Sequence, residues 1–426
     1  MIAAARPSPA ARLPERALAA RPGGLSRGKD VARKKKKVVL CWELGGGTGY
    51  TSWMVEIARG LQAEGCAAVL ALRELVPVIH LTAGLKAPVL PAPVAPGRLP
   101  KPARGRGFHP NGFADLMLAN GFGQTHELNA LVRAWRGIID QVKPDLIVGA
   151  YCPVLGVAAY GRVPLALIGY GYTLPPADQA RFPLFRGKRD AYADQDEMLT
   201  RVRRVQGALG APLPERLTDI HRGDTRFLLS FSEIDPYRAM RQEPSVGALE
   251  DLGPILPLPL EPRFYAYLVS GKPFVRTVVE GLLHCGLPGA IYLRNPNMAP
   301  PSDLEQRGIE WLTRPPPLPE AMAGASVVIH HGGANTLHAA LAAGRPQVLV
   351  PRNLDQSVMA QEAEDFRAAV RLGSKATPEA IGETVRRVAT EPELLRNLNA
   401  YARLVRARGH HDALPRIVEA CLKLLA

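Results

Sequence analysis

Apolar runs of strand length alternate with amphipathic helical segments along most of the chain. The first example is an apolar run at residues 38–44, a glycine-rich turn, a segment with apolar residues at helical spacing, and a second apolar run at residues 67–74. A strand, a glycine turn, a helix and another strand form the βαβ unit of a parallel sheet. The pattern therefore predicts an α/β fold, in which ligands bind beyond the carboxyl ends of the strands.

The same alternation continues through both halves of the chain. In the first half we expect helices at 128–142 and 190–207 and strands at 144–150, 164–176 and 227–235. In the second half we expect strands at 264–268, 290–293, 326–330 and 347–350 and helices at 275–284, at 335–343 and from residue 356 onward. Each half is therefore predicted to build its own sheet.

A proline-rich segment, EDLGPILPLPLEP at residues 250–262, separates the two halves. Such a segment is typical of a hinge, and a chain of 426 residues is too long for one ordinary core. We therefore predict two Rossmann-like parallel-sheet domains, at residues 37–257 and 258–426, that face each other across a cleft.

The net charge of +14 is concentrated at the N-terminus, where residues 1–37 hold 11 of the 53 Lys and Arg residues against two acids. No RNA- or DNA-binding motif accompanies the charge, so it does not predict a nucleic-acid partner. Residues 1–36 lack hydrophobic periodicity and are expected to form a disordered basic tail. A solvated tail, or a start codon assigned too early, fits this composition better than a transit peptide or a lipid-binding segment.

Five cysteines are scattered along the chain and never form a CxxC pair. This spacing predicts reduced thiols in a cytoplasmic protein rather than disulfides or a zinc site. The longest uncharged apolar stretch, Leu146–Gly161, contains Pro153 and is shorter than the ~20 residues of a transmembrane helix. Contact with a membrane is therefore expected to be peripheral at most.

The stretch HHGGANTLHAALAAG, which begins at His330, places two histidines and two glycines where a strand passes into a helix. The free N–H groups and the dipole at the start of that helix favour an anion, above all a phosphate. The glycines allow close backbone approach, while Asn335 and Thr336 can cap the helix or donate to a phosphate oxygen. The residues assigned to this site are His331, Gly332, Gly333, Ala334, Asn335 and Thr336. The alternative is that His330 and His331 only end a buried strand.

Asp355 and Gln356 follow the next predicted strand and are expected at the same edge of the sheet. A carboxylate and a carboxamide side by side suit sugar hydroxyls, which both donate and accept hydrogen bonds. Alone, such a pair is more often part of a helix cap. Together with the phosphate site, the pair predicts binding of a nucleotide-sugar.

Residues 313–356 resemble the 44-residue donor-binding signature of family 1 glycosyltransferases, the UDP-glycosyltransferase-like enzymes of the GT-B fold. The matching positions are Pro315, His331, Gly333, Asn335, Thr336, Gly344, Pro346, Pro351, Asp355 and Gln356. The first half is similar to bacterial members in its glycine-rich first turn and in the segments PDLIVGAYCP, FPLFR and LGP. The resemblance implies an inverting, metal-independent glycosyltransferase that moves a sugar from a UDP- or dTDP-sugar to a hydroxyl of a small lipophilic acceptor. The acceptor would bind to the first domain and the donor to the second.

The resemblance also assigns roles to single residues. His331 would stabilise the departing diphosphate, Ser270 and Pro315 would contact the donor, and Asp355 and Gln356 would hold the sugar.

Three positions depart from the family pattern. Thr313 stands where an aromatic residue stacks on the nucleobase, Pro316 stands where a glutamine is usual, and Ala339 stands at the ribose-binding glutamate. Trp311 either supplies the stacking from two residues upstream or belongs to the core.

The family's catalytic base, a histidine in the first glycine turn, is replaced here by Tyr50. Tyrosine has an ordinary pKa near 10 and is a poor base at neutral pH, so Tyr50 either orients the acceptor or packs. The substitute bases in the same domain are Glu43, His109, Asp115 and His126. If none of them acts, the protein is a weak or inactive homologue that binds nucleotide-sugar. A nucleotide-sugar epimerase of the same fold is the third hypothesis.

Other ligand motifs do not match this chain. GGGTGY, from Gly45, lacks the last glycine of GxGxxG, GKP at Gly271 lacks the spacing of a Walker A loop, and GxSxG is absent. Asp194 and Asp196 resemble a metal-binding DxD pair but lie in a polar helical run, so we expect them at the surface. We therefore expect no essential metal and no cofactor beside the nucleotide-sugar, which is a co-substrate.

Overall fold

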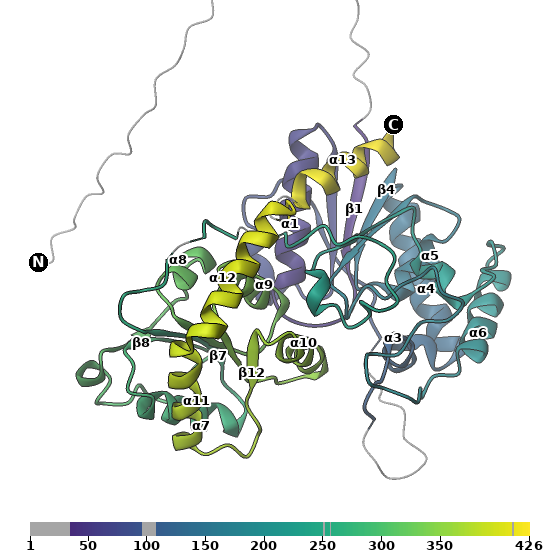
Figure 1. Cartoon of the computed structure of the whole chain (residues 1–426). Coiled ribbons are helices and arrows are strands. Elements are labelled where there is room, and N and C mark those ends of the chain that lie inside the picture. Colours follow the sequence, from purple (N-terminus) through teal and green to yellow (C-terminus); the bar gives the residue numbers. More distant parts are fainter. Residues whose placement is uncertain (1–34, 96–107, 250–251, 256, 411–412) are drawn as a thin grey trace, which may run out of the picture. The chain divides into compact units, whose positions relative to one another are not determined.

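Both predicted parallel sheets are present (Figure 1). A computed structural model describes residues 35–95, 108–249, 252–255, 257–410 and 413–426. Each sheet has six strands, in the orders β3-β2-β1-β4-β5-β6 and β12-β11-β10-β7-β8-β9, and all neighbouring strands are parallel. The α/β class predicted from the sequence is therefore confirmed.

The first sheet is built around β1, which pairs with both β2 and β4. Its strands are β1 (Lys37–Trp42), β2 (Ala67–Leu72), β3 (Val89–Pro91), β4 (Leu146–Ala150), β5 (Leu165–Gly169) and β6 (Thr225–Leu228). The α-helices of this half are α1 (Gly49–Ala63), α2 (Ile79–Thr82), α3 (Phe113–Met117), α4 (Thr125–Val142), α5 (Pro153–Ala159) and α6 (Gln195–Ala208). Shorter helical turns cover Val76–Val78, Leu118–Phe122, Leu217–His221 and Ser232–Ile234.

The second sheet is built around β7 and β10, which pair with each other. Its strands are β7 (Phe264–Val269), β8 (Gly289–Arg294), β9 (Ile309–Leu312), β10 (Val327–His330), β11 (Gln347–Leu349) and β12 (Ala369–Arg371). The helices of this half are α7 (Pro273–His284), α8 (Leu318–Ala323), α9 (Ala334–Ala342), α10 (Leu354–Asp365), α11 (Pro378–Thr390), α12 (Pro392–Ala407) and α13 (Ala413–Leu425), with a short turn at Glu305–Arg307.

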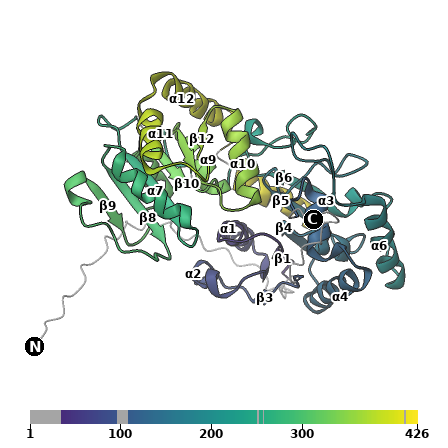
Figure 2. The same cartoon turned by 90° about the horizontal axis from the view of Figure 1, so that it is seen from below.

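Glycines let two pairs of helices pack closely; one of these pairs, α7 and α11, can be seen in Figure 2. α7 and α11 lie side by side, and a Cβ added at Gly281 of α7 would come within 2.6 Å of Ile381 of α11. The C-terminal helix α13 lies against α1 of the first half (Figure 1). There, a Cβ added at Gly60 would be 2.7 Å from Val418.

Three elements differ clearly from their predicted bounds. The strand expected at 164–176 covers only Leu165–Gly169. The strand expected at 227–235 ends at Leu228, and a turn of 3-10 helix follows at Ser232–Ile234. The helix expected at 190–207 begins only at Gln195, because the exposed Asp194 side chain accepts the backbone N–H groups of the next turn and caps it. Short polar side chains that cap helices are hard to distinguish from the helix interior by periodicity alone.

The remaining predictions on chain organisation are only partly covered by the structure. Of the predicted tail, residues 1–36, only Lys35 and Lys36 are among the described residues, and the domain bounds at 37–257 and 258–426 stay predictions. All five cysteines are buried and free. Within the described part of the chain, no helix has the length and apolar character needed to cross a membrane.

Candidate active site

A cavity of about 560 Å³ lies where the carboxyl ends of strands from both sheets meet. Its walls come from β7, from the last residues of β8 and β10, and from the segments that follow β1, β5, β9, β10 and β11. The start of α1, residues 46–50, and the start of α9, residues 333–336, both line it. This is the position in which parallel α/β sheets bind ligands.

Both helix starts are uncapped. α1 begins after Thr48 and α9 after Gly333, and neither residue makes a side-chain cap. The first N–H groups of an α-helix have no partner inside the helix. Two positive ends of helix dipoles therefore face one cavity, which makes it a site for an anion.

Glycines let the two helix starts come close together. Gly47, before α1, and Gly332, before α9, adopt positive φ angles of 96° and 83°, which favour glycine. A Cβ added at Gly49 would lie only 3.2 Å from Oδ1 of Asn335. The first glycine turn therefore lies close to the start of α9.

The two histidines of the motif are fully hydrogen-bonded within the protein. His330 Nδ1 accepts the N–H of Gly332 at 3.1 Å, and its Nε2 lies 2.7 Å from Oε1 of Gln347. His331 Nε2 accepts the N–H of Val269 at 2.7 Å, so its Nδ1 carries the proton that goes to the carbonyl of Val350, also at 2.7 Å.

This arrangement corrects the predicted role of His331. Both ring nitrogens are occupied, and burial lowers the pKa of His331 to about 4, so the ring is neutral and has no N–H left for a diphosphate. His331 instead joins the end of β7 to the segment that follows β11. Gly332 likewise is not among the residues that line the cavity, because its N–H points to His330. The backbone N–H groups that start α9 have no side-chain cap and can donate to an anion.

Asp355 and Gln356 lie in the first turn of α10 and both line the cavity, as the sequence analysis expected. The helix is capped by Asn353. Oδ1 of Asp355 accepts the N–H of Gln356 at 2.6 Å, and Oδ2 accepts the hydroxyl of Tyr170 at 3.0 Å. Oε1 of Gln356 accepts the N–H of Arg352 at 2.9 Å. The pair thus has fixed orientations and meets a phenol from the first sheet.

Two arginines that the sequence analysis did not identify also line the cavity. Arg294 ends β8, and Arg352 follows β11 and donates to the carbonyl of Ser270 at 3.0 Å. Ser270 itself does not line the cavity, because its hydroxyl donates to the carbonyl of Asn295. Ser270 was predicted to contact the donor, but it holds Arg352 in place instead. The position of both arginines at strand ends is the signal that would have revealed them.

Tyr50 lines the cavity from the first turn of α1. Its ring stacks on Trp42 with centroids 5.5 Å apart, and its hydroxyl lies 3.1 Å from that of Tyr170. Burial, reinforced by the carboxylate of Asp355, raises the pKa of Tyr50 well above its ordinary value. Tyr50 is therefore not a base by its own ionisation.

None of the four substitute bases lines this cavity. The carboxylate of Glu43 is buried and accepts two backbone N–H groups of α5; desolvation, opposed by those bonds, raises its pKa to about 8. Asp115 is buried and accepts three backbone N–H groups. His109 is exposed, and His126 lines a separate cavity.

The positions of the donor-binding signature that lie near β9 differ in whether they line the cavity. Pro315 and Pro316 line it, whereas Thr313 is exposed and does not. Trp311 is partly buried against the core of the second sheet and is not a lining residue. Of the two alternatives for Trp311, the structure therefore supports the core position.

Tyr265 and Tyr267, on alternate positions of β7, supply aromatic surface to this end of the cavity. Tyr265 packs in one apolar cluster with Ala339. A strand with tyrosines two residues apart presents both on one face, which was the overlooked signal.

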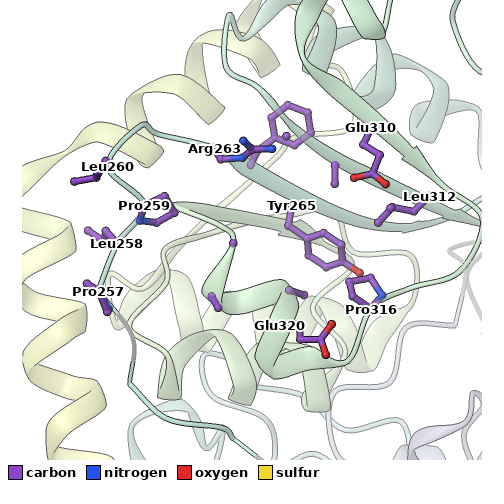
Figure 3. Close-up of a pocket in the computed structure, with 16 residues that line it drawn as sticks. Pro257, Leu258, Pro259, Leu260, Arg263, Tyr265, Glu310, Leu312, Pro316 and Glu320 are labelled. Carbon is purple, nitrogen blue, oxygen red and sulfur yellow. The ribbon is translucent and has the colours of Figure 1, made fainter. Parts of the chain in front are cut away.

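A second, larger cavity of about 810 Å³ shares Tyr265 and Pro316 with the first (Figure 3). Its wall includes the connecting segment at residues 257–260. In Figure 3 the Tyr265 ring lies between Glu310 and Glu320, with its hydroxyl toward Pro316. That hydroxyl is buried and has no hydrogen-bond partner among the described residues. The second cavity therefore adjoins the first at Tyr265 and Pro316.

The C-terminal region is similar to a known protein family. Residues 307–418 match the C-terminal domain of erythromycin biosynthesis protein CIII-like proteins. One relative is the UDP-N-acetylglucosamine–N-acetylmuramyl-(pentapeptide) pyrophosphoryl-undecaprenol N-acetylglucosamine transferase of Desulfitobacterium hafniense, 34% identical over 131 residues. That match covers 28% of this chain and only 35% of the relative. A PGL/p-HBAD biosynthesis glycosyltransferase of Mycobacterium tuberculosis is 28% identical over 347 residues, 73% of this chain and 78% of the relative.

Solved structures match along almost the whole chain. The calicheamicin glycosyltransferase CalG4 superimposes with a TM-score of 0.65 at 17% identity, over 92% of this chain and 99% of its own. The glycosyltransferase VinC, in complex with dTDP, has a TM-score of 0.57 at 17% identity, over 91% and 99%. The spinosyn rhamnosyltransferase SpnG, complexed with spinosyn aglycone, has a TM-score of 0.61 at 17% identity, over 89% and 99%. The chain therefore shares the fold of these glycosyltransferases along almost its whole length, and its C-terminal region is similar in sequence to the CIII-like C-terminal domain.

Proposed function

We propose that this protein transfers a sugar from a nucleoside diphosphate donor to a hydroxyl group of a small lipophilic acceptor. The observation that carries the proposal is one cavity that joins two uncapped helix N-termini with Asp355 and Gln356. VinC, which has a similar fold, was solved in complex with dTDP, and SpnG in complex with spinosyn aglycone. These complexes support a nucleotide-sugar donor and a small acceptor.

The diphosphate would bind at the start of α9. The N–H groups of Ala334, Asn335 and Thr336 have no partner in the first helical turn, and all three residues line the cavity. The guanidinium groups of Arg294 and Arg352 add positive charge there. Hydrogen bonds to a charged group contribute ~1.5–3 kcal/mol each, so these groups suffice for specific binding.

The sugar would lie between the diphosphate and α10. Asp355 accepts hydrogen bonds only, whereas the amide of Gln356 both donates and accepts. Both side chains are oriented by hydrogen bonds to the backbone or to a neighbouring side chain. A pair with fixed orientation selects sugars by the direction of their hydroxyls.

We infer an inverting displacement. The acceptor oxygen attacks the anomeric carbon from the side opposite the diphosphate, and the bond from that carbon to the diphosphate oxygen breaks. The electron pair leaves with the nucleoside diphosphate, whose growing charge faces the helix N–H groups and the arginines. Because these groups carry the stabilisation, the proposal requires no metal ion.

The acceptor would approach along the wall that belongs to the first sheet. This wall is aromatic, with Tyr50, Trp53 and Tyr170 as lining residues. Large rings contribute apolar surface that a lipophilic aglycone covers on binding. The wall also brings an acceptor hydroxyl next to the phenol of Tyr50.

The experiment is an assay of nucleoside diphosphate release from UDP- and dTDP-sugars, with and without hydroxylated aglycones. The proposal expects acceptor-dependent release, a product of inverted anomeric configuration by NMR, and a rate unchanged by EDTA. Donor binding without any acceptor-dependent release would overturn transferase activity. That outcome would favour the second candidate, a nucleotide-sugar-binding homologue, which is motivated by the buried phenol of Tyr50 at the position of the family's base.

A further inference from the structure

Three side chains form a hydrogen-bonded chain across the cavity. The hydroxyl of Tyr50 lies 3.1 Å from that of Tyr170, which in turn donates to Oδ2 of Asp355 at 3.0 Å. Tyr50 belongs to α1 and Tyr170 directly follows β5, whereas Asp355 belongs to α10. The chain therefore joins the acceptor side of the cavity to the donor side.

The carboxylate of Asp355, at the end of this chain, fixes the direction of its hydrogen bonds. An ionised carboxylate accepts only, so Tyr170 must donate to Asp355. The oxygen of Tyr170 then accepts the proton of Tyr50. The oxygen of Tyr50 keeps the capacity to accept one more hydrogen bond, and Tyr50 is one of the residues that line the cavity.

Packing holds both phenols in this geometry. Tyr50 stacks on Trp42 at 5.5 Å and meets the edge of Trp53 at 5.6 Å. Tyr170 stacks on Tyr172 with centroids 6.3 Å apart. Side chains that are already fixed lose little freedom when a substrate joins the chain.

Asp355 also supplies the carboxylate that can accept a proton in this cavity. Among the described residues that line the cavity, it is the only carboxylate, and the two histidines there have both ring nitrogens engaged. A proton leaving an acceptor hydroxyl on the first-sheet wall therefore has one hydrogen-bonded route to a carboxylate.

We propose that Tyr50, Tyr170 and Asp355 form a proton relay that takes over the work of a single catalytic base. The proposal rests on the transferase function proposed above. As the acceptor oxygen bonds to the anomeric carbon, its proton passes to the oxygen of Tyr50. The proton of Tyr50 passes to Tyr170, and that of Tyr170 passes to Asp355. The nucleoside diphosphate leaves with the electron pair, and Asp355 later returns its proton to solvent.

The three transfers occur together, because neither phenol holds a negative charge here. Burial, reinforced by Asp355, raises the pKa of both Tyr50 and Tyr170 well above the ordinary value of tyrosine. Burial also raises the pKa of Asp355, opposed by its hydrogen bonds from Tyr170 and Gln356. A carboxylate with a raised pKa binds the transferred proton more firmly.

The first test is Tyr170→Phe, which removes the middle hydroxyl and keeps the ring. At saturating donor we expect kcat to fall by ~10²–10⁴-fold, as for loss of general-base catalysis. Tyr50→Phe should give a similar loss, and the double variant no greater loss than either single one, because the two act as one path. Tyr172→Phe, in the same aromatic cluster but outside the chain of bonds, is the control and should keep wild-type kcat.

The second readout is the pH dependence of kcat. The titratable groups that face Asp355 are the phenols of Tyr50, Tyr151, Tyr170 and Tyr172, which stay neutral in acid. Wild-type kcat should therefore fall in acid as Asp355 takes up a proton. This decline should disappear in Tyr170→Phe, whose residual rate no longer uses the carboxylate.

Two results would overturn the relay while leaving the transferase function standing. One is a Tyr170→Phe variant with kcat within twofold of wild type. The other is a large loss with the acid decline intact, which would show a purely positional effect. If wild type releases no nucleoside diphosphate with any acceptor, both the relay and the transferase function fail.

Discussion

Replacing His331 with alanine should destabilise the second domain, because the imidazole links the end of β7 to the segment that follows β11. Its Nε2 accepts the N–H of Val269, its Nδ1–H donates to the carbonyl of Val350, and only 5% of the residue is exposed. A protein hydrogen bond contributes ~1 kcal/mol net, and an unpaired buried polar group costs ~1–3 kcal/mol. Water from the adjoining cavity can replace one partner, so we expect a loss of about 2–4 kcal/mol.

The measurement is the free energy of unfolding in urea, followed by circular dichroism, together with kcat of the folded fraction. We expect the stability loss to exceed the catalytic loss, with kcat lowered less than about tenfold (about 1.4 kcal/mol). His284→Ala is the matched control, because His284 is an exposed histidine at the end of α7. It should change neither quantity.

A direct donor to the diphosphate would behave differently. Losing such a group lowers the rate by ~10²–10³-fold, about 2.7–4 kcal/mol in the barrier, with little effect on folding. A His331→Ala variant with wild-type stability and that rate loss would refute the structural role and show that the ring changes partners when the donor binds.

Three further predictions concern pH, close contact and charge. The pKa values of His330 and His331 are about 4 in the folded state against ~6.5 unfolded, so the unfolded chain binds more protons between these values. The free energy of unfolding should be highest above pH 6.5 and fall by about 3 kcal/mol per histidine toward pH 4. It is measured by urea unfolding across this pH range. Gly49→Val should crowd Asn335, 3.2 Å from the added Cβ, and raise the donor KM measured by nucleotide release. Arg352→Gln should weaken nucleoside diphosphate binding about 10–100-fold in calorimetry, since it removes a charged donor.

Control variants and contradicting results can be stated for these three predictions. Gly207→Ala, in open space on α6, should leave the donor KM unchanged, and an equal effect there would remove the close-contact argument. Arg307→Gln, an exposed arginine paired with Asp303, should leave nucleotide affinity unchanged. A flat stability profile between pH 6.5 and 4 would contradict the buried neutral histidines.

The sequence was sufficient for the features that depend on local pattern. Apolar runs of strand length and glycine turns predicted both parallel sheets, and the run from Gly333 to Thr336 predicted a helix start at a strand end. Asp355 and Gln356 were placed at the same edge because carboxyl ends of parallel strands share it. These predictions needed no information on how distant segments meet.

What could not be predicted depends on contacts between distant residues. His331 takes its partners from positions 62 and 19 residues away, so the motif around it gives no sign that both ring nitrogens are hydrogen-bonded. Tyr170 is 120 residues from Tyr50 and 185 from Asp355. No periodicity joins those three positions, so the sequence pointed only to single substitute bases such as Glu43.

The central claim, that the backbone N–H groups starting α9 bind the diphosphate, is tested most directly by calorimetry of UDP and dTDP binding to Ala334→Pro. Proline removes one N–H, yet it is tolerated at the first helical position, and Gly333 before it has the extended ψ of 140° that proline requires. Thr125→Pro, at the first position of α4, is the control for the proline itself. The account predicts at least about tenfold weaker binding for Ala334→Pro, with the control and both melting temperatures unchanged. Equal affinity of wild type and Ala334→Pro would contradict it.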